Sequence, residues 1–267
     1  MKKRPPFRRD RPKPQGTPRG KPEGDDLLRV GGLPAVQALF GRGAARVERL
    51  FFTPERRRDA EPFCATLSRV HKPWREVGAD ELAKIAGSQL HGGIVALARP
   101  KPVLDFDPGI EKARFLLVLD GVGNPHNFGA IVRTAAFFGL DRIVISGSPA
   151  QAGPSAAAHR VAEGGLEFVD VYRAANLPAS LKRLRPRYRI IGTALGQGGD
   201  LRSLTRDKPI ALVLGNEEKG LDAATLAVCD QVLTLPGSGA VQSLNVAATA
   251  AILIHALRPS AASEPSR

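Results

Sequence analysis

The sequence predicts an α/β protein in which a small α/β unit precedes a larger domain with a mostly parallel sheet. The larger domain, expected over residues 113–258, alternates short apolar runs with helical stretches, which is typical of a parallel sheet covered by helices on both faces. The smaller unit, expected over residues 26–98, repeats this alternation over a shorter length. Residues 99–112 contain three prolines and no clear period, so we expect a linker.

The order of the elements follows from where the apolar runs lie. In the smaller unit the pattern predicts helical stretches and apolar runs, in chain order, at 35–40, 50–53, 62–70, 80–86 and 93–97. In the larger domain it predicts buried strands at 115–119, 142–145, 168–171, 189–193, 210–214 and 231–235. Residues 259–267 are expected to form a disordered tail.

Charge indicates a polyanionic partner. The chain has 267 residues and a formal net charge of +13, which fits RNA, DNA or an acidic membrane surface. Residues 1–25 carry nine Lys and Arg against three Asp and Glu, with six prolines, and we expect a disordered basic arm. Such an arm can contact RNA phosphates, or it can simply keep the protein soluble.

The rest of the composition excludes several classes of protein. Cys64 and Cys229 lie far apart without a CxxC spacing, which gives no support to a disulfide framework or a structural zinc site. No apolar run reaches the roughly 18 residues of a membrane span, and no apolar signal segment follows the basic N-terminus. We therefore expect a soluble, cytoplasmic protein with no metal site.

Ligands of such parallel sheets bind beyond the carboxyl ends of the strands, so chemistry is sought directly after the predicted strands. After the strand at 115–119 comes DGVGNPHNFGAIVRTAAFFG, where Asn127 is a candidate cap for an apolar helix. Arg133 is the only charged residue of that helix, and a guanidinium needs an anion, either a protein carboxylate or a phosphate. A salt bridge that only holds a loop is the alternative.

Two further strands are followed by unusual segments. After 210–214 comes GNEEKGL, whose glycines permit a tight turn and whose Glu217 or Glu218 is a candidate partner for Arg133, although a plain turn is also possible. After 231–235 comes PGSGAVQSLNVAATAAILIHAL, a loop leading into an Ala-rich helix that should be deeply buried. Ser243 is a candidate N-cap and Asn245 lies in the first turn, where capping or an internal hydrogen bond would also explain them.

Other cofactor and nucleophile signatures are missing. The chain has no GxxxxGK[ST] phosphate loop, and Gly121-Val-Gly123 lacks the third glycine of a dinucleotide fingerprint because His126 stands there. No GxSxG elbow and no cluster with metal-ligand spacing occurs. ATP hydrolysis, a Rossmann cofactor site and metal catalysis are therefore not expected.

The three segments together resemble the signature motifs of the SpoU (TrmH) branch of the SPOUT RNA methyltransferases. The matching residues are, in chain order, Asn127, Gly129, Arg133 and Thr134, then Gly215 and Glu217, then Leu235, Pro236, Ser243, Leu244 and Asn245. The smaller unit, ending in HGGIVAL, looks like the ribosomal-protein-L30e-like substrate-binding domain that precedes many members of the family. The resemblance covers about residues 27–257.

The resemblance implies a fold and an activity. It implies a C-terminal domain with a deep trefoil knot, a topology that general rules of chain connection would not predict. It implies a homodimer that binds S-adenosylmethionine and transfers its methyl group to a ribose 2′-hydroxyl of ribosomal or transfer RNA. The cofactor-binding residues that it implies are Thr193, Ala194, Gly215, Asn216, Leu235, Leu244 and Asn245.

The same resemblance names the catalytic candidates Arg133, Asn127, Glu217, Ser243 and Asn245. Arg133 would act on the ribose hydroxyl, either as a base or, as we prefer because an Arg pKa lies above about 12, by holding the hydroxyl and a phosphate in place. Ribosomal RNA is favoured over transfer RNA because the smaller unit looks like a ribosomal-protein fold. The alternatives are a catalytically silent RNA-binding relative and a methyltransferase that acts on a base.

Overall fold

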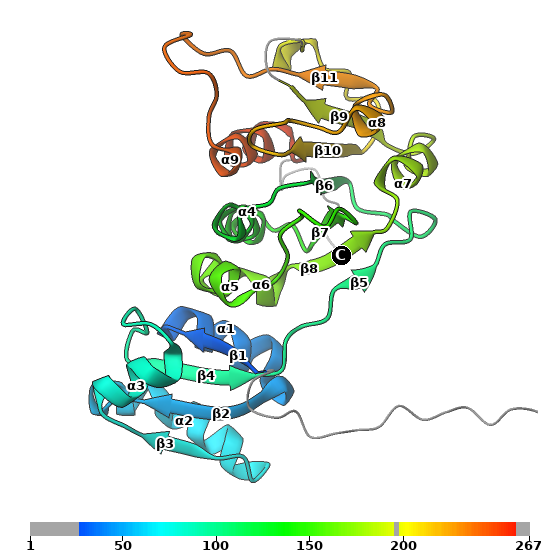
Figure 1. Cartoon of the computed structure of the whole chain (residues 1–267). Coiled ribbons are helices and arrows are strands. Elements are labelled where there is room, and N and C mark those ends of the chain that lie inside the picture. The colour runs from blue at the N-terminus through cyan, green and yellow to red at the C-terminus, as the bar shows by residue number, and fades with distance from the viewer. Residues whose placement is uncertain (1–26, 195–197, 260–267) are drawn as a thin grey trace, which may run out of the picture.

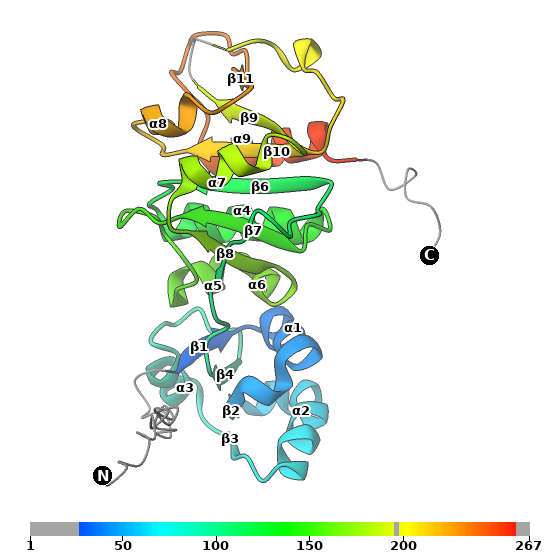
Figure 2. The same ribbon diagram turned by 90° about the vertical axis from the view of Figure 1, so that its right-hand side faces the viewer.

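Two β-sheets, one in each unit, are stacked end to end in an elongated molecule (Figures 1 and 2). This computed structural model describes residues 27–194 and 198–259. The predicted basic arm and nearly all of the predicted tail lie outside the described residues. The strands of the smaller sheet lie between Leu28 and Ala98, and those of the larger sheet between Leu104 and Leu233.

The first unit is a four-stranded sheet in the order β1-β4-β2-β3, with helices packed against it. Leu50 and Ile94 of the sheet are fully buried together with Leu39 and Leu67, which come from the first two helices. The elements are β1 (Leu28–Gly31), α1 (Leu33–Gly43), η1 (Ala44–Arg46), β2 (Val47–Phe52), η2 (Pro54–Arg56), α2 (Arg57–Arg69), β3 (Trp74–Glu76), α3 (Ala79–Ala86) and β4 (Ile94–Ala98).

The second unit is a seven-stranded sheet in the order β11-β9-β10-β6-β7-β8-β5, and every strand pair in it is parallel. Its strands are β5 (Leu104–Asp105), β6 (Phe115–Asp120), β7 (Arg142–Ser146), β8 (Asp170–Ala174), β9 (Arg189–Thr193), β10 (Ile210–Gly215) and β11 (Gln231–Leu233). Its helices are α4 (Pro125–Phe137), α5 (Ala156–Ala162), α6 (Gly165–Phe168), α7 (Leu177–Leu184), η3 (Leu201–Ser203), α8 (Ala223–Leu226) and α9 (Val246–Leu257). This confirms the predicted mostly parallel α/β fold.

Alternation along the central strand β6 explains why both faces of this sheet are covered. Leu117 and Leu119 belong to the core beneath α4 and α9, whereas Leu116 and Val118 belong to a second core beneath α7. All four side chains are fully buried, as expected for a strand with helices on both sides. Figure 1 shows α4 and α9 on the face opposite α7.

The structure differs from the sequence prediction mainly in short elements. Strand β8 starts at Asp170, because Phe168 ends helix α6 instead of opening a strand. Strand β3 (WRE) is a largely exposed edge strand and has no apolar alternation by which to detect it. The expected linker contains the two-residue strand β5, which pairs with β8 and extends the large sheet.

The junction between the units is close-packed and polar. Gly164, with a φ of 89°, lies so near α1 that an added Cβ would be 2.8 Å from Ala38 Cβ. Beside it the Arg46 guanidinium forms an ion pair with the carboxylate of Glu167, whose side chain is only 2% exposed. Burial raises the pKa of Glu167 and lowers the pKa of the neighbouring His159 to about 4. An ion pair that is mostly removed from water thus lies across the junction between the two units.

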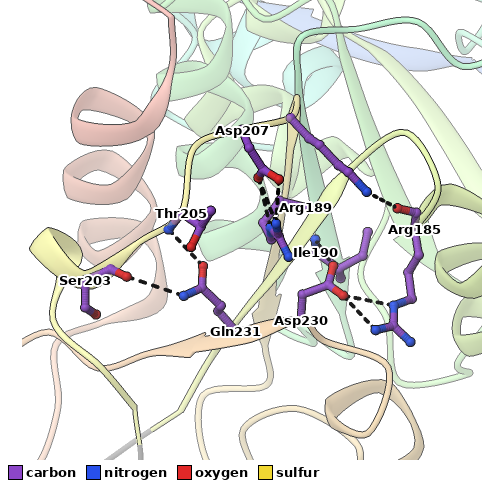
Figure 3. A network of polar contacts seen from close by, with 9 residues as sticks. Arg185, Arg189, Ile190, Ser203, Thr205, Asp207, Asp230 and Gln231 are labelled. Carbon is purple, nitrogen blue, oxygen red and sulfur yellow. Dashed lines mark hydrogen bonds and ion pairs between the residues drawn. The ribbon is translucent and has the colours of Figure 1, made fainter.

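The amino ends of β9 and β11 are fixed by a separate network of charged and polar groups (Figure 3). Asp230 accepts hydrogen bonds from Arg185 at 2.8 and 2.9 Å and from the Ile190 backbone at 2.9 Å. Arg189 donates to both carboxylate oxygens of Asp207, at 2.8 and 2.7 Å. Because β9, β10 and β11 are parallel, their carboxyl ends all lie at the opposite edge of the sheet from this network.

Candidate active site

A cavity of about 550 Å³ lies beyond the carboxyl ends of β9, β10 and β11. Four parts of the chain form it: the carboxyl end of β9, the turn after β10, the long loop that joins β11 to α9, and α9 itself. Its size is within the usual range of small-molecule sites, about 300–1,000 Å³. The side chains and backbone groups around it come from residues 233–239 and 241–244 and from Thr193, Ala194, Gly215, Asn216, Glu217, Gly220, Val246, Thr249 and Leu253.

The turn after β10 is shaped by backbone constraints. An added Cβ at Gly215 would lie 2.3 Å from the carbonyl carbon of Gly220, a distance that no side chain can occupy. Asn216 and Gly220 exchange two backbone hydrogen bonds of 2.9 Å, and Gly220 has a φ of 71°. Asn216 Oδ1 also accepts hydrogen bonds from the backbone N–H groups of Glu218 and Lys219, each at 3.0 Å. The turn therefore holds Glu217 in a fixed direction.

The three predicted residues Asn127, Glu217 and Asn245 form one chain of hydrogen bonds. Asn245 Nδ2 donates to Asn127 Oδ1 at 3.0 Å, and Asn127 Nδ2 donates to Glu217 Oε1 at 2.7 Å. Asn216 Nδ2 extends the chain by donating to Glu217 Oε2 at 3.4 Å and to the Gly121 carbonyl at 2.8 Å. The ends of β6 and β10 and the start of α9 are thereby tied together by side chains, and the Glu217 end of the chain borders the cavity.

Two predicted helix caps are wrong by a few residues. Asn124, and not Asn127, caps α4 by accepting from the His126 backbone N–H at 2.8 Å. Asn245, and not Ser243, caps α9 by accepting from the Ala247 N–H at 2.8 Å. Because Asn127 is not used as a cap, its amide is available for Glu217. Ser243 is exposed in the loop that lines the cavity.

Arg133 does not lie in this cavity, and the predicted pairing with Glu217 or Glu218 is wrong. Its Nη2 is 2.8 Å from Glu163 Oε2, and its side chain is 57% exposed. Six residues separate it from Asn127 on α4, which turns the side chain by about 240° and moves it about 9 Å along the axis. The two residues therefore point to different neighbours, and within one protomer Arg133 faces the turn between α5 and α6.

Every cofactor-binding residue expected from the sequence except Asn245 borders the cavity: Thr193, Ala194, Gly215, Asn216, Leu235 and Leu244. Thr234 also borders it and was not expected. Its hydroxyl donates to the Ala194 carbonyl at 2.8 Å and accepts from the Gly198 N–H at 2.9 Å, so it joins two of the cavity walls. The only signal for it in the sequence is a polar residue that ends an apolar run.

The other motif glycine has a packing role. An added Cβ at Gly129 would lie 2.6 Å from the Ala158 carbonyl oxygen, so α4 and α5 approach closely only because this residue has no side chain. In the described part of the chain, no three His, Cys, Asp or Glu side chains gather so that they could hold a metal ion. Over the same residues, the helices are all too short or too polar to cross a membrane.

Comparison with known proteins shows which family this chain matches. The family model described as "SpoU rRNA Methylase family" matches residues 114–255, and the model "RNA 2'-O ribose methyltransferase substrate binding" matches residues 29–104. The 23S rRNA (guanosine-2'-O-)-methyltransferase RlmB of Nitrosomonas europaea is 37% identical over 180 residues, or 66% of this chain and 69% of the relative. The enzyme of the same name from Ralstonia nicotianae is 34% identical over 85% of this chain and 94% of its own length.

Solved structures show the same fold. A putative RNA methyltransferase of the TrmH family from Porphyromonas gingivalis superposes with a TM-score of 0.65 at 25% identity, over 87% of this chain and 89% of that one. An AdoMet-bound rRNA methyltransferase from Sinorhizobium meliloti superposes with a TM-score of 0.71 at 22% identity, over 87% of each chain. The family models, the relatives and the fold agree, and the chain belongs to the SpoU rRNA methylase family.

Proposed function

We propose that this protein transfers a methyl group from S-adenosylmethionine to a ribose 2′-hydroxyl of ribosomal RNA. The observation that carries the proposal is the hydrogen-bonded chain of Asn127, Glu217 and Asn245 at the edge of the 550 Å³ cavity. These residues come from the three motifs by which the sequence resembles the family. The relatives are 23S rRNA (guanosine-2'-O-)-methyltransferases, and a guanosine of 23S rRNA is therefore the substrate that we propose to test first.

The cavity suits a cofactor that has both polar and apolar parts. Leu233, Val246 and Leu253 give it an apolar floor, while Thr193 and Thr234 bring hydroxyl groups to its walls. We propose that the cofactor is held by Thr193, Ala194, Gly215, Asn216, Leu235, Leu244 and Asn245, largely through backbone groups. When bound, S-adenosylmethionine supplies an electrophilic methyl group, and the protein has to align the acceptor oxygen with it.

The residues of this chain divide that work. The Glu217 carboxylate orients the Asn127 amide, and the amide in turn accepts from Asn245, which leaves a polar edge against which a ribose can be placed. Ser243, exposed beside this edge, can bond to either substrate. Arg133 carries a guanidinium that suits a phosphate and the neighbouring hydroxyl as a clamp, because an Arg side chain keeps its proton.

A homodimer would bring Arg133 to a cavity from which it is turned away in its own protomer. The exposed apolar residues Phe137 (83% exposed) and Ile252 (43%) lie on α4 and α9, which pack against each other. Large apolar side chains that are exposed on two packed helices are candidates for an interface. We propose that a second copy covers it and that Arg133 of each protomer serves the cavity of its partner.

The proposed function also implies a fold and a cellular location for the chain. We propose the trefoil knot for the segments around the cavity and the L30e-like fold for the first unit, with the domain boundaries at 26–98, 99–112 and 113–258. The free thiols of Cys64 and Cys229 suit a protein that works beside ribosomes in the cytoplasm.

One experiment separates this proposal from its rivals. The purified protein is incubated with labelled S-adenosylmethionine and rRNA from cells that lack the gene, and the RNA is digested to nucleosides for mass spectrometry. We expect one 2′-O-methylated nucleoside, together with micromolar or tighter cofactor binding by calorimetry. Absence of cofactor binding would favour a catalytically silent RNA-binding protein, whereas a methylated base would favour a base-modifying enzyme.

A further inference from the structure

The ion pair of Arg133 with Glu163 has no role in the function proposed above. Both side chains are about half exposed, at 57% and 51%, and exposed ion pairs contribute little to stability. No other carboxylate of the described residues lies within ion-pair distance of Arg133. The direction of this guanidinium therefore depends on one partner, and that partner is 30 positions further along the chain.

The backbone at Glu163 is unusual for its residue type. It ends α5 in the left-handed region, with φ 44° and ψ 46°, which glycine or asparagine adopt at lower cost. Of the described residues other than glycine, only His71 shares a positive φ. A glutamate in this conformation costs more conformational energy than a glycine would. The contact that its side chain makes in return is the ion pair with Arg133.

The turn that carries Glu163 is fixed from two sides. Gly164 lies against α1 of the first unit, where an added Cβ would be 2.8 Å from Ala38 Cβ. Gly165 lies against α4, where an added Cβ would be 3.2 Å from the Cα of Arg133 itself. Because two packed helices hold the turn, the Glu163 carboxylate starts from a well-defined position and can define the position of the guanidinium.

We propose that Glu163 is a positioning residue for Arg133. Its carboxylate holds the guanidinium in one direction on the surface of α4, so that the cation is ordered before RNA arrives, and ordering a flexible side chain in advance lowers the cost of using it. This inference rests on the proposed function, in which Arg133 contacts the ribose or its phosphate. Since the α5–α6 turn also touches the first unit, the direction of Arg133 depends on how that unit is docked.

The test uses the full-length protein and the variants Glu163→Gly and Glu163→Gln. Glycine removes the carboxylate and also suits the left-handed backbone, so we expect an unchanged or higher Tm together with a roughly tenfold fall in kcat/KM for RNA. The affinity for S-adenosylmethionine should stay within twofold of the wild type. Glutamine keeps a hydrogen-bond acceptor and should restore part of the loss.

The matched control is Asp207→Asn, which breaks an Arg–carboxylate pair at the amino end of β9, where the two side chains are 48% and 23% exposed (Figure 3). It should keep wild-type kinetics. A wild-type kcat/KM in Glu163→Gly, an equal loss in Asp207→Asn, or a loss of activity that merely follows a lowered Tm would each overturn the proposal.

A second readout does not depend on catalysis. Phenylglyoxal modifies free guanidinium groups, and peptide mass spectrometry reports its rate at Arg133. We expect faster modification of Arg133 in Glu163→Gly than in the wild type, and an equal rate would overturn the inference alone. A wild-type protein that methylates no RNA would instead reject the proposed function, so the two failures can be told apart.

Discussion

Asn127 and Arg133 lie six residues apart on α4, and the rotation of the helix between them sends their side chains to different neighbours. Both residues belong to one sequence motif, and the sequence predicted that they would act together. In the structure Asn127 bonds to Glu217 and Asn245, whereas Arg133 pairs with Glu163. The sequence thus identified residues able to carry the chemistry, but their partners depended on helix rotation and on distant segments.

The amide of Asn127 leads to the first prediction. Asn127→Ala removes two hydrogen bonds, one of them to a carboxylate, and such bonds are worth about 1.5–3 kcal/mol, so kcat should fall about 10- to 100-fold. At neutral pH the kcat of Asn127→Asp should fall further than that of Asn127→Ala. The reason is repulsion, because the aspartate places a second carboxylate where the Asn127 amide now lies 2.7 Å from Glu217. Steady-state kinetics with calorimetry of cofactor binding checks this. An alanine variant more impaired than the aspartate variant would contradict it.

Gly215 leads to the second prediction. Gly215→Ala places a Cβ against the backbone of Gly220, which must shift the turn that carries Glu217, and binding of S-adenosylmethionine should be lost together with several degrees of Tm. The control is Gly41→Ala on α1, where a Cβ meets nothing within 4 Å and should raise stability by about 0.5–1 kcal/mol. Calorimetry and thermal melting measure both. Equal cofactor affinities in the two variants would show that the turn tolerates a side chain.

At the scale of elements, the central strands of the large sheet were predictable because each is a buried apolar run, as in β6 and β10. Short exposed elements were not, and β3 and β5 illustrate why: two or three residues at a sheet edge have no period. The α5–α6 turn and its glycines were also missed as a site of interest. These glycines matter because α1 and α4 pack so closely on either side of the turn that a side chain would not fit, and local sequence does not show this contact.

The junction of the units gives the third prediction, on pH. His159 on α5 is buried, and its burial, with Arg46 and Lys101 nearby, lowers its pKa from 6.5 to about 4. The unfolded chain binds the proton more readily, so His159 does not lower the free energy of unfolding above pH 6.5 and lowers it progressively, by about 3 kcal/mol in all, as the pH falls towards 4. Urea unfolding of wild type and His159→Gln at pH 7 and pH 4 measures the difference. A loss equal in both proteins would assign the acid sensitivity to other groups. Glu167 is not one of them, because its raised pKa makes the folded state more stable, not less, as the pH falls.

At the scale of the whole molecule, the net charge of +13 is read directly from the sequence. Such a charge favours binding to RNA through its phosphate groups. The basic residues 1–25 lie outside the described residues, but their charge alone supports a fourth prediction. Deleting them should weaken RNA binding and flatten the slope of log K against log salt, because fewer counterions are released. Filter binding at 50–200 mM salt checks this, and an unchanged slope would remove the arm from RNA binding.

The proposed dimer gives the fifth prediction. Arg133→Ala and Asn127→Ala should each be nearly inactive alone, but subunits mixed in equal amounts should regain about a quarter of the wild-type activity. Half of the randomly formed dimers then contain both variants, and one of their two shared sites is intact. Activity assays after co-refolding measure the recovery. No recovery would place Arg133 and Asn127 of a single protomer at the same site.

The sequence by itself determined the fold class, the family, the three motif segments and most of the residues around the cavity. These follow from local patterns: apolar runs, turn glycines and polar residues placed after strands. Only the tertiary structure decided which polar groups meet. In the structure Asn124 and Asn245 cap the helices α4 and α9. Asn127 donates a hydrogen bond to Glu217, and Arg133 forms an ion pair with Glu163. The physical reason is that a side-chain partner depends on helix rotation and on contacts between segments 30 to 120 residues apart, which no local pattern encodes.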